Sequence, residues 1–142
     1  MISKRTKYGI KALTCIARSK DNTPMQTRVI AESENISPKY LENILIQLRK
    51  SGILGSKKGK GGGYYLLNPA SQTRMTQVMR ALEGPIALVS CVSLNYYEKC
   101  DDCPDENACS VHKLMLQVRD NTLAIFNNTD LSDLVKDQNA TE

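Results

Sequence analysis

The chain has 142 residues, enough for one domain with an appendage and a sizeable hydrophobic core. It has no long apolar run and no signal-peptide core at its basic N-terminus, so a cytoplasmic protein without membrane contact is expected. Its net charge of +4 is unevenly distributed: residues 1–67 carry 13 Lys and Arg against 4 Asp and Glu, whereas residues 68–142 carry 6 against 11. This asymmetry indicates a polyanionic partner for the front half alone.

Two helices are expected before the first motif. Residues 4–20 show helical spacing of apolar side chains, with basic residues over much of the remaining surface. Cys15 falls within this helix and is interpreted as a small core residue. A turn at residues 21–24 separates it from a short helix at residues 27–34. With the helix that follows, this short helix predicts a helix-turn-helix.

The helix that begins at residue 38 is predicted to read DNA. Ser37 can cap its first backbone N–H groups, and Pro38 has a backbone angle already suited to a first turn. Apolar residues at three- and four-residue spacing predict one buried face, formed by Leu41, Ile44, Leu45 and Leu48. Another face carries groups that can reach base edges or phosphates, namely Lys39, Tyr40, Asn43 and Gln47.

Two apolar runs around a basic, glycine-rich turn predict a two-stranded hairpin. The tip, residues 57–63, contains Lys57, Lys58 and Lys60 among glycines. Lysines on a tip without bulky side chains can lie against a phosphate backbone or enter a minor groove. A helix followed by such a hairpin is the winged-helix arrangement for binding duplex DNA. The alternative is a solvated lysine loop on a small α/β domain.

A long helix is expected from residue 110 onward. Before it, a helix capped by Thr76 closes at Gly84-Pro85. The long helix carries a coiled-coil-like seam that we predict to be a dimer interface, made of Val111, Met115, Val118, Thr122 and Ile125. A second apolar stripe contains Leu116, Leu123 and Phe126. Two apolar stripes must be covered by two partners. These are expected to be the chain's own N-terminal domain and the same helix of a second subunit; the alternative is that a single-chain bundle covers both stripes. A short final turn at residues 131–135 and a frayed polar tail complete the prediction.

Four of the five cysteines lie within one segment that lacks a helical or strand period. Cys91, Cys100, Cys103 and Cys109 are followed by the only histidine, His112. Without a secretion signal, such clustering argues for metal or redox chemistry rather than a disulfide framework. Cys109 and His112 are one helical turn apart, and thiolates with an imidazole suit zinc or an iron–sulfur cluster. The alternative for His112 is an ordinary surface residue.

Short motifs along nearly the whole chain resemble one known family. They are Lys7-Tyr8-Gly9, Ile36-Ser37-Pro38-Lys39-Tyr40-Leu41-Glu42, residues 48–54, residues 58–67, Ala81-Leu82-Glu83-Gly84-Pro85-Ile86 and residues 131–135. These motifs are similar to those of the Rrf2 superfamily of bacterial winged-helix regulators. Its members include iron–sulfur, nitric-oxide, iron and cysteine-metabolism regulators. The resemblance implies a mainly α fold with a small β-hairpin: a winged helix-turn-helix domain (residues 1–85), a cluster-binding loop (86–109), and a dimerisation helix with its tail (110–142).

The resemblance also implies a homodimer on a palindromic operator in double-stranded DNA, with reading helices in major grooves and wings at minor grooves. Glu42 and Asn43 match positions that touch bases, and Lys58 matches a wing cation. Glu42 can accept from a cytosine amino group, which makes it a specificity gate. The residues expected at DNA are Ser37, Lys39, Tyr40, Glu42, Asn43, Gln47, Lys57, Lys58, Lys60, Gly61 and Gly62.

In the iron–sulfur branch of the superfamily, three cysteines and a histidine hold a 2Fe–2S cluster. The matching residues here are Cys91, Cys103, Cys109 and His112. The spacing from Cys91 to Cys103 is longer than in that branch, so Cys100 is an alternative ligand. In some relatives an acidic residue of the partner's first helix completes the cluster, but Lys7 and Tyr8 occupy that place here. A 4Fe–4S cluster or zinc would be the alternative cofactor.

The sequence therefore predicts a transcriptional regulator, most simply a repressor, that senses iron–sulfur, redox or nitric-oxide status. It is not expected to be an enzyme, since no nucleophile–base pairing is evident beyond the single histidine. One rival is a cluster-free regulator of the same fold, with a thiol/disulfide switch or a zinc clip. The C-x-x-C spacing of Cys100 and Cys103 supports that rival. A second rival is an iron–sulfur electron carrier.

Overall fold

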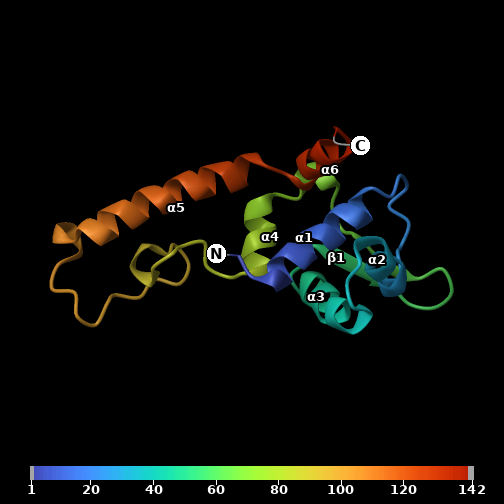
Figure 1. The fold of residues 1–142 in the computed structure, drawn as a ribbon, viewed down its shortest axis with the longest axis horizontal. Helices are drawn as coiled ribbons and strands as arrows, with labels where there is room; N and C mark the ends of the chain where they lie inside the picture. Colours follow the sequence, from blue (N-terminus) through green and yellow to red (C-terminus); the bar gives the residue numbers. More distant parts are fainter. Residues whose placement is uncertain (1, 141–142) are drawn as a thin grey trace.

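The computed structural model describes residues 2–140 and shows a winged domain from which one long helix projects (Figure 1). The winged domain contains α1 (Lys4–Ala17), α2 (Thr27–Glu34), α3 (Pro38–Lys50), β1 (Leu54–Lys57), β2 (Gly63–Leu66) and α4 (Met75–Leu82). The mainly helical fold with one small hairpin is as predicted. The first helix ends at Ala17, earlier than the predicted residue 20. None of the helices in the described chain combines the length and apolar character that a membrane span requires.

The hairpin, called the wing below, is antiparallel, and Leu54 pairs with Leu66 while Lys57 pairs with Gly63. Two further contacts join it to the rest of the domain. Met25 exchanges backbone hydrogen bonds of 2.9 and 2.8 Å with Tyr64. The side-chain amide of Asn22 donates to the Leu66 carbonyl and accepts from the Leu66 N–H. The wing is therefore fastened at its base while its lysine tip projects.

The hydrophobic core lies between α1, α3, α4 and the wing. The four apolar residues of α3 that were predicted to face inward are fully buried, and they meet Ala12, Leu13 and Ile16 of α1. Cys15 belongs to this core, as predicted, and its sulfur lies 3.7 Å from Met25 Sδ. Burial raises the pKa of the Cys15 thiol, which keeps it protonated and unreactive.

Two predicted helix caps are wrong. The Ser37 side chain makes no capping hydrogen bond, and Pro38 alone marks the start of α3. The α4 helix begins at Met75, and Thr76 donates instead to Asn127 Oδ1 at the end of the long helix. A tertiary hydrogen bond has thus replaced the local one for Thr76. Sequence spacing alone does not reveal such a bond.

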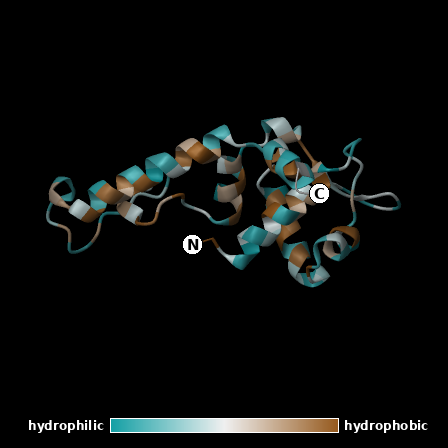
Figure 2. Ribbon diagram, turned by 45° about the horizontal axis from the view of Figure 1, so that its top comes forward, coloured by the Kyte–Doolittle hydropathy of each residue, from teal (hydrophilic) through white to brown (hydrophobic). Residues whose placement is uncertain are grey.

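The long helix α5 (Ser110–Asn128) matches its predicted start and contains no fully buried residue. Figure 2 shows hydrophobic positions along α5 outside the winged domain. After a break, α6 (Leu131–Ala140) returns to the domain, where Leu131 is fully buried. Backbone bonds from Leu131 N to Thr73 O and from Met75 N to Thr129 O hold it there. The predicted short turn at residues 131–135 is therefore a ten-residue helix, because packing on the domain stabilises a segment with weak local signals. Residues 141 and 142 of the predicted frayed tail lie outside the described part.

The start of α1 and the end of α4 are joined by one carboxylate. Glu83 accepts hydrogen bonds from the Ser3 N–H at 3.1 Å, from the Ser3 hydroxyl at 3.0 Å and from the Thr6 hydroxyl. These bonds, chiefly the one from Thr6, lower the pKa of Glu83. The joint lies directly before Gly84 and Pro85, where the chain leaves the winged domain.

Replacing Glu83 with glutamine is expected to lower the free energy of unfolding at pH 7, by at most about 1 kcal/mol because the group is solvent-exposed. A carboxylate whose pKa is lower in the folded state stabilises the protein above its unfolded pKa, near 4.3. This contribution disappears as the pH falls through the folded pKa. Urea unfolding at pH 7 and below pH 4 should therefore show a difference between the two proteins that shrinks in acid. A constant difference would contradict the assignment.

Candidate DNA-binding surface and cysteine site

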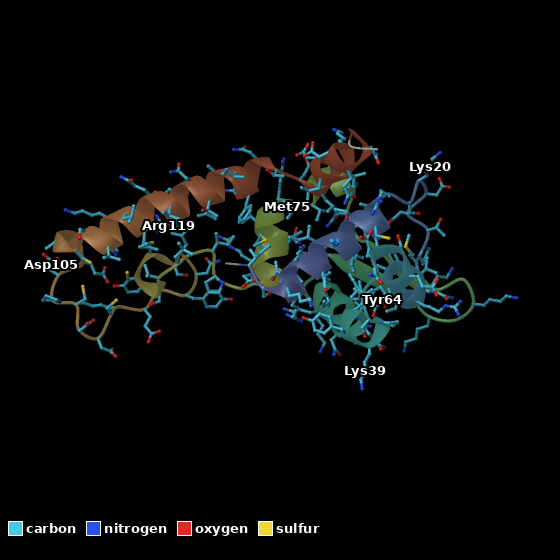
Figure 3. The ribbon with its side chains drawn as sticks, in the orientation of Figure 1. Lys20, Lys39, Tyr64, Met75, Asp105 and Arg119 are labelled. Atoms are coloured by element: carbon cyan, nitrogen blue, oxygen red, sulfur yellow. The ribbon has the colours of Figure 1, made fainter. Side chains whose placement is uncertain are left out.

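The outer face of α3 carries the predicted reading residues. Lys39, Tyr40, Glu42 and Asn43 are exposed, and Figure 3 shows Lys39 pointing away from the domain. Ser37 is also exposed at the start of the helix. The side chains that can contact base edges thus occupy one free face of a helix whose other face is buried.

The ring of Tyr40 is fixed by a neighbouring aromatic side chain. Tyr8 of α1 meets Tyr40 edge to face, with ring centroids 5.8 Å apart and an interplanar angle of 86°. Lys4 Nζ lies 5.5 Å from the Tyr8 ring centroid. This pair orients the start of α3 relative to α1, and it adds a cation beside the reading face.

Gln47 is placed differently from the prediction. Its side-chain nitrogen donates to the Ala81 carbonyl in the last turn of α4, and its oxygen accepts from Arg5 of α1. The residue is therefore engaged inside the winged domain, joining three helices, rather than presented to DNA. The position of Gln47 on the polar face of α3 does not predict that its hydrogen-bond partners are Arg5 and Ala81.

The wing exposes all three predicted lysines, Lys57, Lys58 and Lys60. Gly61 is exposed too, with a left-handed φ of 76°. Gly62, which was also predicted to contact DNA, is buried. Its N–H donates to Gly59 O, and a Cβ there would lie 2.2 Å from the Lys57 carbonyl oxygen. Gly62 therefore closes the turn, while the lysines and Gly61 form its outer surface.

Replacing Gly63 with alanine is expected to destabilise the protein by about 2–4 kcal/mol. Gly63 has φ +140°, and an added Cβ would lie 2.4 Å from the backbone carbonyl of Met25. Because the clash is with backbone atoms, it can be relieved only if the wing moves. Chemical denaturation measures the loss. Gly61→Ala is the matched control, because it also has positive φ but no atom within 4 Å, and it should cost only about 1 kcal/mol. Equal losses in both variants would contradict the proposed clash.

The cysteine segment, residues 86–109, runs outward from the winged domain, and α5 returns toward the domain alongside it (Figure 1). It contains two 3-10 turns, Ser90–Val92 and Glu106–Ala108, and the first is packed down, leaving Cys91 only 9% exposed and Val92 1% exposed. Cys100 is exposed, and Cys103 and Cys109 are half-buried. All five cysteines of the chain are free thiols in this structure.

Two of the predicted ligands are in contact. Cys91 Sγ lies 3.3 Å from His112 Nδ1. Cys109 occupies the N-cap position of α5, where its sulfur accepts from the His112 backbone N–H at 3.4 Å. The first turn of α5 therefore brings Cys91, Cys109 and His112 together. Cys103 is held in a tight turn by its N–H bond to the Cys100 carbonyl.

The thiols of Cys100 and Cys103 both have a raised pKa. Desolvation is the largest cause for each, followed by neighbouring cysteines: Cys91 for Cys100, and Cys109 for Cys103. Nearby acidic residues, Asp102 and Glu106, add to the effect. Both thiols are therefore protonated at neutral pH in the metal-free protein, and a bound metal would displace their protons.

The donor set fits a soft metal or an iron–sulfur cluster by its chemistry, since four cysteine sulfurs and one imidazole occur within residues 91–112. The geometry is open: among residues 2–140, no three His, Cys, Asp or Glu side chains converge closely enough to enclose a metal ion. The Cys100 thiol nevertheless interacts with the Cys91 thiol, and Cys103 lies near Cys109 and Cys100.

Comparison with known proteins decides the family. The Rrf2 family model, described as an iron-dependent transcriptional regulator, matches residues 2–137. The chain belongs to the Rrf2 family. It is therefore a DNA-binding transcriptional regulator rather than an enzyme, which confirms the prediction from the reading-helix and wing motifs and sets aside the electron carrier.

Individual Rrf2 relatives cover nearly the whole chain. An rrf2-like HTH-type regulator of Rhodobacter capsulatus is 34% identical over 138 residues, covering 95% of this chain and 92% of the relative. The regulator IscR of Cronobacter sakazakii is 28% identical, covering 96% and 81%. Among solved structures, CymR, the global cysteine regulator of B. subtilis, matches with TM-score 0.78 and 28% identity over 96% of each chain. T. potens IscR matches with TM-score 0.75 and 25% identity, covering 97% and 88%.

Proposed function

We propose that this Rrf2 protein is a cytoplasmic, homodimeric repressor that controls its operator according to the state of a 2Fe–2S cluster. The contact of Cys91 with His112, beside Cys109, carries the proposal. Cys91, Cys103, Cys109 and His112 would hold the cluster, with Cys100 as the alternative to Cys91. The cluster would supply a redox- and nitric-oxide-sensitive centre when bound.

The DNA-binding mode follows from the free face of α3 and the basic wing. Lys39, Tyr40, Glu42 and Asn43 would enter the major groove, while the wing lysines would meet the backbone or the minor groove. Ser37 and Gly61 would lie against phosphates. Two subunits would read half-sites about one helical turn apart, roughly 34 Å, so a small rotation of one winged domain would weaken binding.

The dimer is supported by the apolar side chains that α5 leaves uncovered. Val111 and Ile125 of the predicted seam are 55% and 65% exposed, and Met115, Val118 and Thr122 are half-buried. Phe126 of the second stripe packs on the core, as expected for a stripe facing the chain's own domain. A groove of about 480 Å³ between α5 and the end of α4, lined by Val118 and Thr122, would receive side chains of the partner.

Signalling would use the same helix. Cys109 and His112 begin α5, and Asn127 at its far end bonds to Thr76 in α4. A change at the cluster would shift α5 against the winged domain and so change the spacing of the two reading helices.

The deciding experiment is the visible spectrum of protein purified without oxygen, with iron, sulfide and operator affinity measured on the same sample. Charge-transfer bands with matching iron and sulfide, and an operator affinity that changes when the cluster is removed, are expected. Cluster loading that leaves operator affinity unchanged would remove the basis for sensing. A protein that stays colourless after reconstitution would contradict the cluster itself.

A second candidate is a cluster-free regulator that uses thiol chemistry or a zinc clip. Two observations favour it: the fold likeness to CymR, a cysteine regulator, and the open arrangement of the cysteine segment. Cys100 and Cys103, joined by a backbone hydrogen bond, would be the switching pair. Zinc and disulfides are colourless, so the same spectrum separates the two candidates.

A further inference from the structure

Arg119 lies at the middle of α5 and points toward the cysteine segment (Figure 3). Its Nη1 donates a 2.7 Å hydrogen bond to the Val92 carbonyl, and its Nε and Nη2 donate to Asp120 Oδ1 at 3.0 and 2.8 Å. The Arg119 side chain is only 15% exposed, whereas that of Asp120 is 65% exposed. A cation this shielded needs good partners, and here one of them is the backbone next to Cys91.

The segment that Arg119 holds is the best-packed part of residues 86–109. Cys91, Val92 and Ser93 are 9%, 1% and 6% exposed. The following residues turn outward, with Leu94 and Tyr96 more than 60% exposed. Arg119 therefore binds the chain where a buried turn meets an exposed loop, which is where the turn would otherwise open.

The loop beyond this point is closed on the same turn. The Ser90 hydroxyl donates to the Glu98 carbonyl at 3.1 Å, and the Glu98 N–H donates to the Ser90 carbonyl at 3.3 Å. The Tyr96 N–H donates to the Ser93 hydroxyl at 3.0 Å. Ser90 to Glu98 thus forms one small unit, and two contacts join it to α5: the Arg119 bond to the Val92 carbonyl and the 3.3 Å contact of Cys91 Sγ with His112 Nδ1.

We infer that Arg119 is the positioning residue for Cys91. Through the Val92 carbonyl it fixes the Cys91 turn against α5, so that the thiol stays beside the His112 ring. Cys91, distant in sequence from Cys109 and His112, then moves with the helix that carries both of them. For the cluster this role depends on the function proposed above, whereas the tether itself is a property of the metal-free chain.

The test compares Arg119→Gln and Arg119→Lys in reduced, metal-free protein by measuring the alkylation rate of each cysteine with peptide mass spectrometry. Losing a charge-assisted hydrogen bond from a shielded site should raise the Cys91 rate by about tenfold in Arg119→Gln, toward the rate of exposed Cys100. Arg119→Lys keeps one donor and should restore most of the protection. Asp120→Asn leaves the Val92 bond intact and serves as the control.

Selectivity distinguishes positioning from general destabilisation. Cys15, buried in the winged domain, should keep its wild-type alkylation rate in every variant. If Arg119→Gln raises the Cys15 rate as well, the comparison with Arg119→Lys decides whether the lost hydrogen bond or general destabilisation exposes Cys91. An unchanged Cys91 rate in Arg119→Gln, or no rescue by lysine, would overturn the inference. After reconstitution, the glutamine variant should also show altered visible circular dichroism. A wild type that takes up no cluster would defeat the proposed sensor, but the alkylation rates would still decide the role of Arg119.

Discussion

Cys91→Ser is expected to lose nearly all bound iron and sulfide, whereas Cys100→Ser keeps the cluster. The two candidate ligands differ in their surroundings: Cys91 is 9% exposed and lies 3.3 Å from His112 Nδ1, whereas Cys100 is solvent-exposed. Serine nearly preserves the shape of cysteine but replaces a soft thiolate with a weakly acidic hydroxyl, a poor ligand for iron–sulfur clusters. The two variants therefore differ in ligation with little difference in packing.

Iron, acid-labile sulfide and visible absorption after anaerobic reconstitution measure the effect, and operator affinity reports its consequence. Cys103→Ser should behave like Cys91→Ser. All three variants should keep the far-UV circular dichroism of the wild type, because the winged domain has its own core. Unfolding of Cys91→Ser or Cys103→Ser would instead indicate a structural metal, which belongs to the zinc-clipped alternative.

A reversed result would assign the ligand role to Cys100. The Cys100 thiol already interacts with the Cys91 thiol, so it is well placed for that role. The same outcome would remove the need of the cluster for a Cys91 turn fixed through Arg119. Loss of the cluster in both variants would mean that Cys91 and Cys100 are both needed. Each pattern is distinct, so the wild type and these variants decide between Cys91 and Cys100.

The features predicted well from the sequence are those encoded locally. The start of α3 at Pro38, its buried apolar face and the lysine-rich turn each depend on residues only a few positions apart. Helical periodicity and glycine-rich turns are visible over that range, so they can be recognised in a sequence whatever the rest of the fold is. Resemblance to a family predicted Cys91, Cys103, Cys109 and His112 as ligands. The structure places Cys91 beside His112 and Cys109 at the start of the same helix, and the ligand set itself stays a prediction.

The features missed depend on partners far away in the chain. Gln47 was expected at DNA because it lies on a polar helical face, but its hydrogen bonds go to Arg5 and Ala81. Arg119 on a long helix has the signature of an ordinary surface cation, and only the folded chain places Val92 beside it. Such pairs, separated by 42, 34 and 27 residues, leave no periodic trace in one sequence.

Replacing both Lys58 and Lys60 with alanine is expected to weaken binding to every duplex, specific or not, and to flatten the salt dependence. Both lysines are exposed on the wing tip, where neighbouring glycines allow close approach to phosphates. Each neutralised phosphate contributes about −0.9 to the slope of log K against log salt, so each altered wing should reduce the slope by up to about 2. Fluorescence anisotropy with an operator and a scrambled duplex, across a salt series, measures both quantities.

The matched control is Lys136→Ala, which removes an exposed lysine from α6 and should leave the slope unchanged. Glu42→Ala, on the reading helix, should instead relax the preference among operators while keeping the slope, because a carboxylate neutralises no phosphate. If the wing variant lost affinity for one operator and kept its binding to scrambled DNA, the wing would be reading bases. The role of reading bases would then belong to the wing, and the role of contacting phosphates would belong to α3.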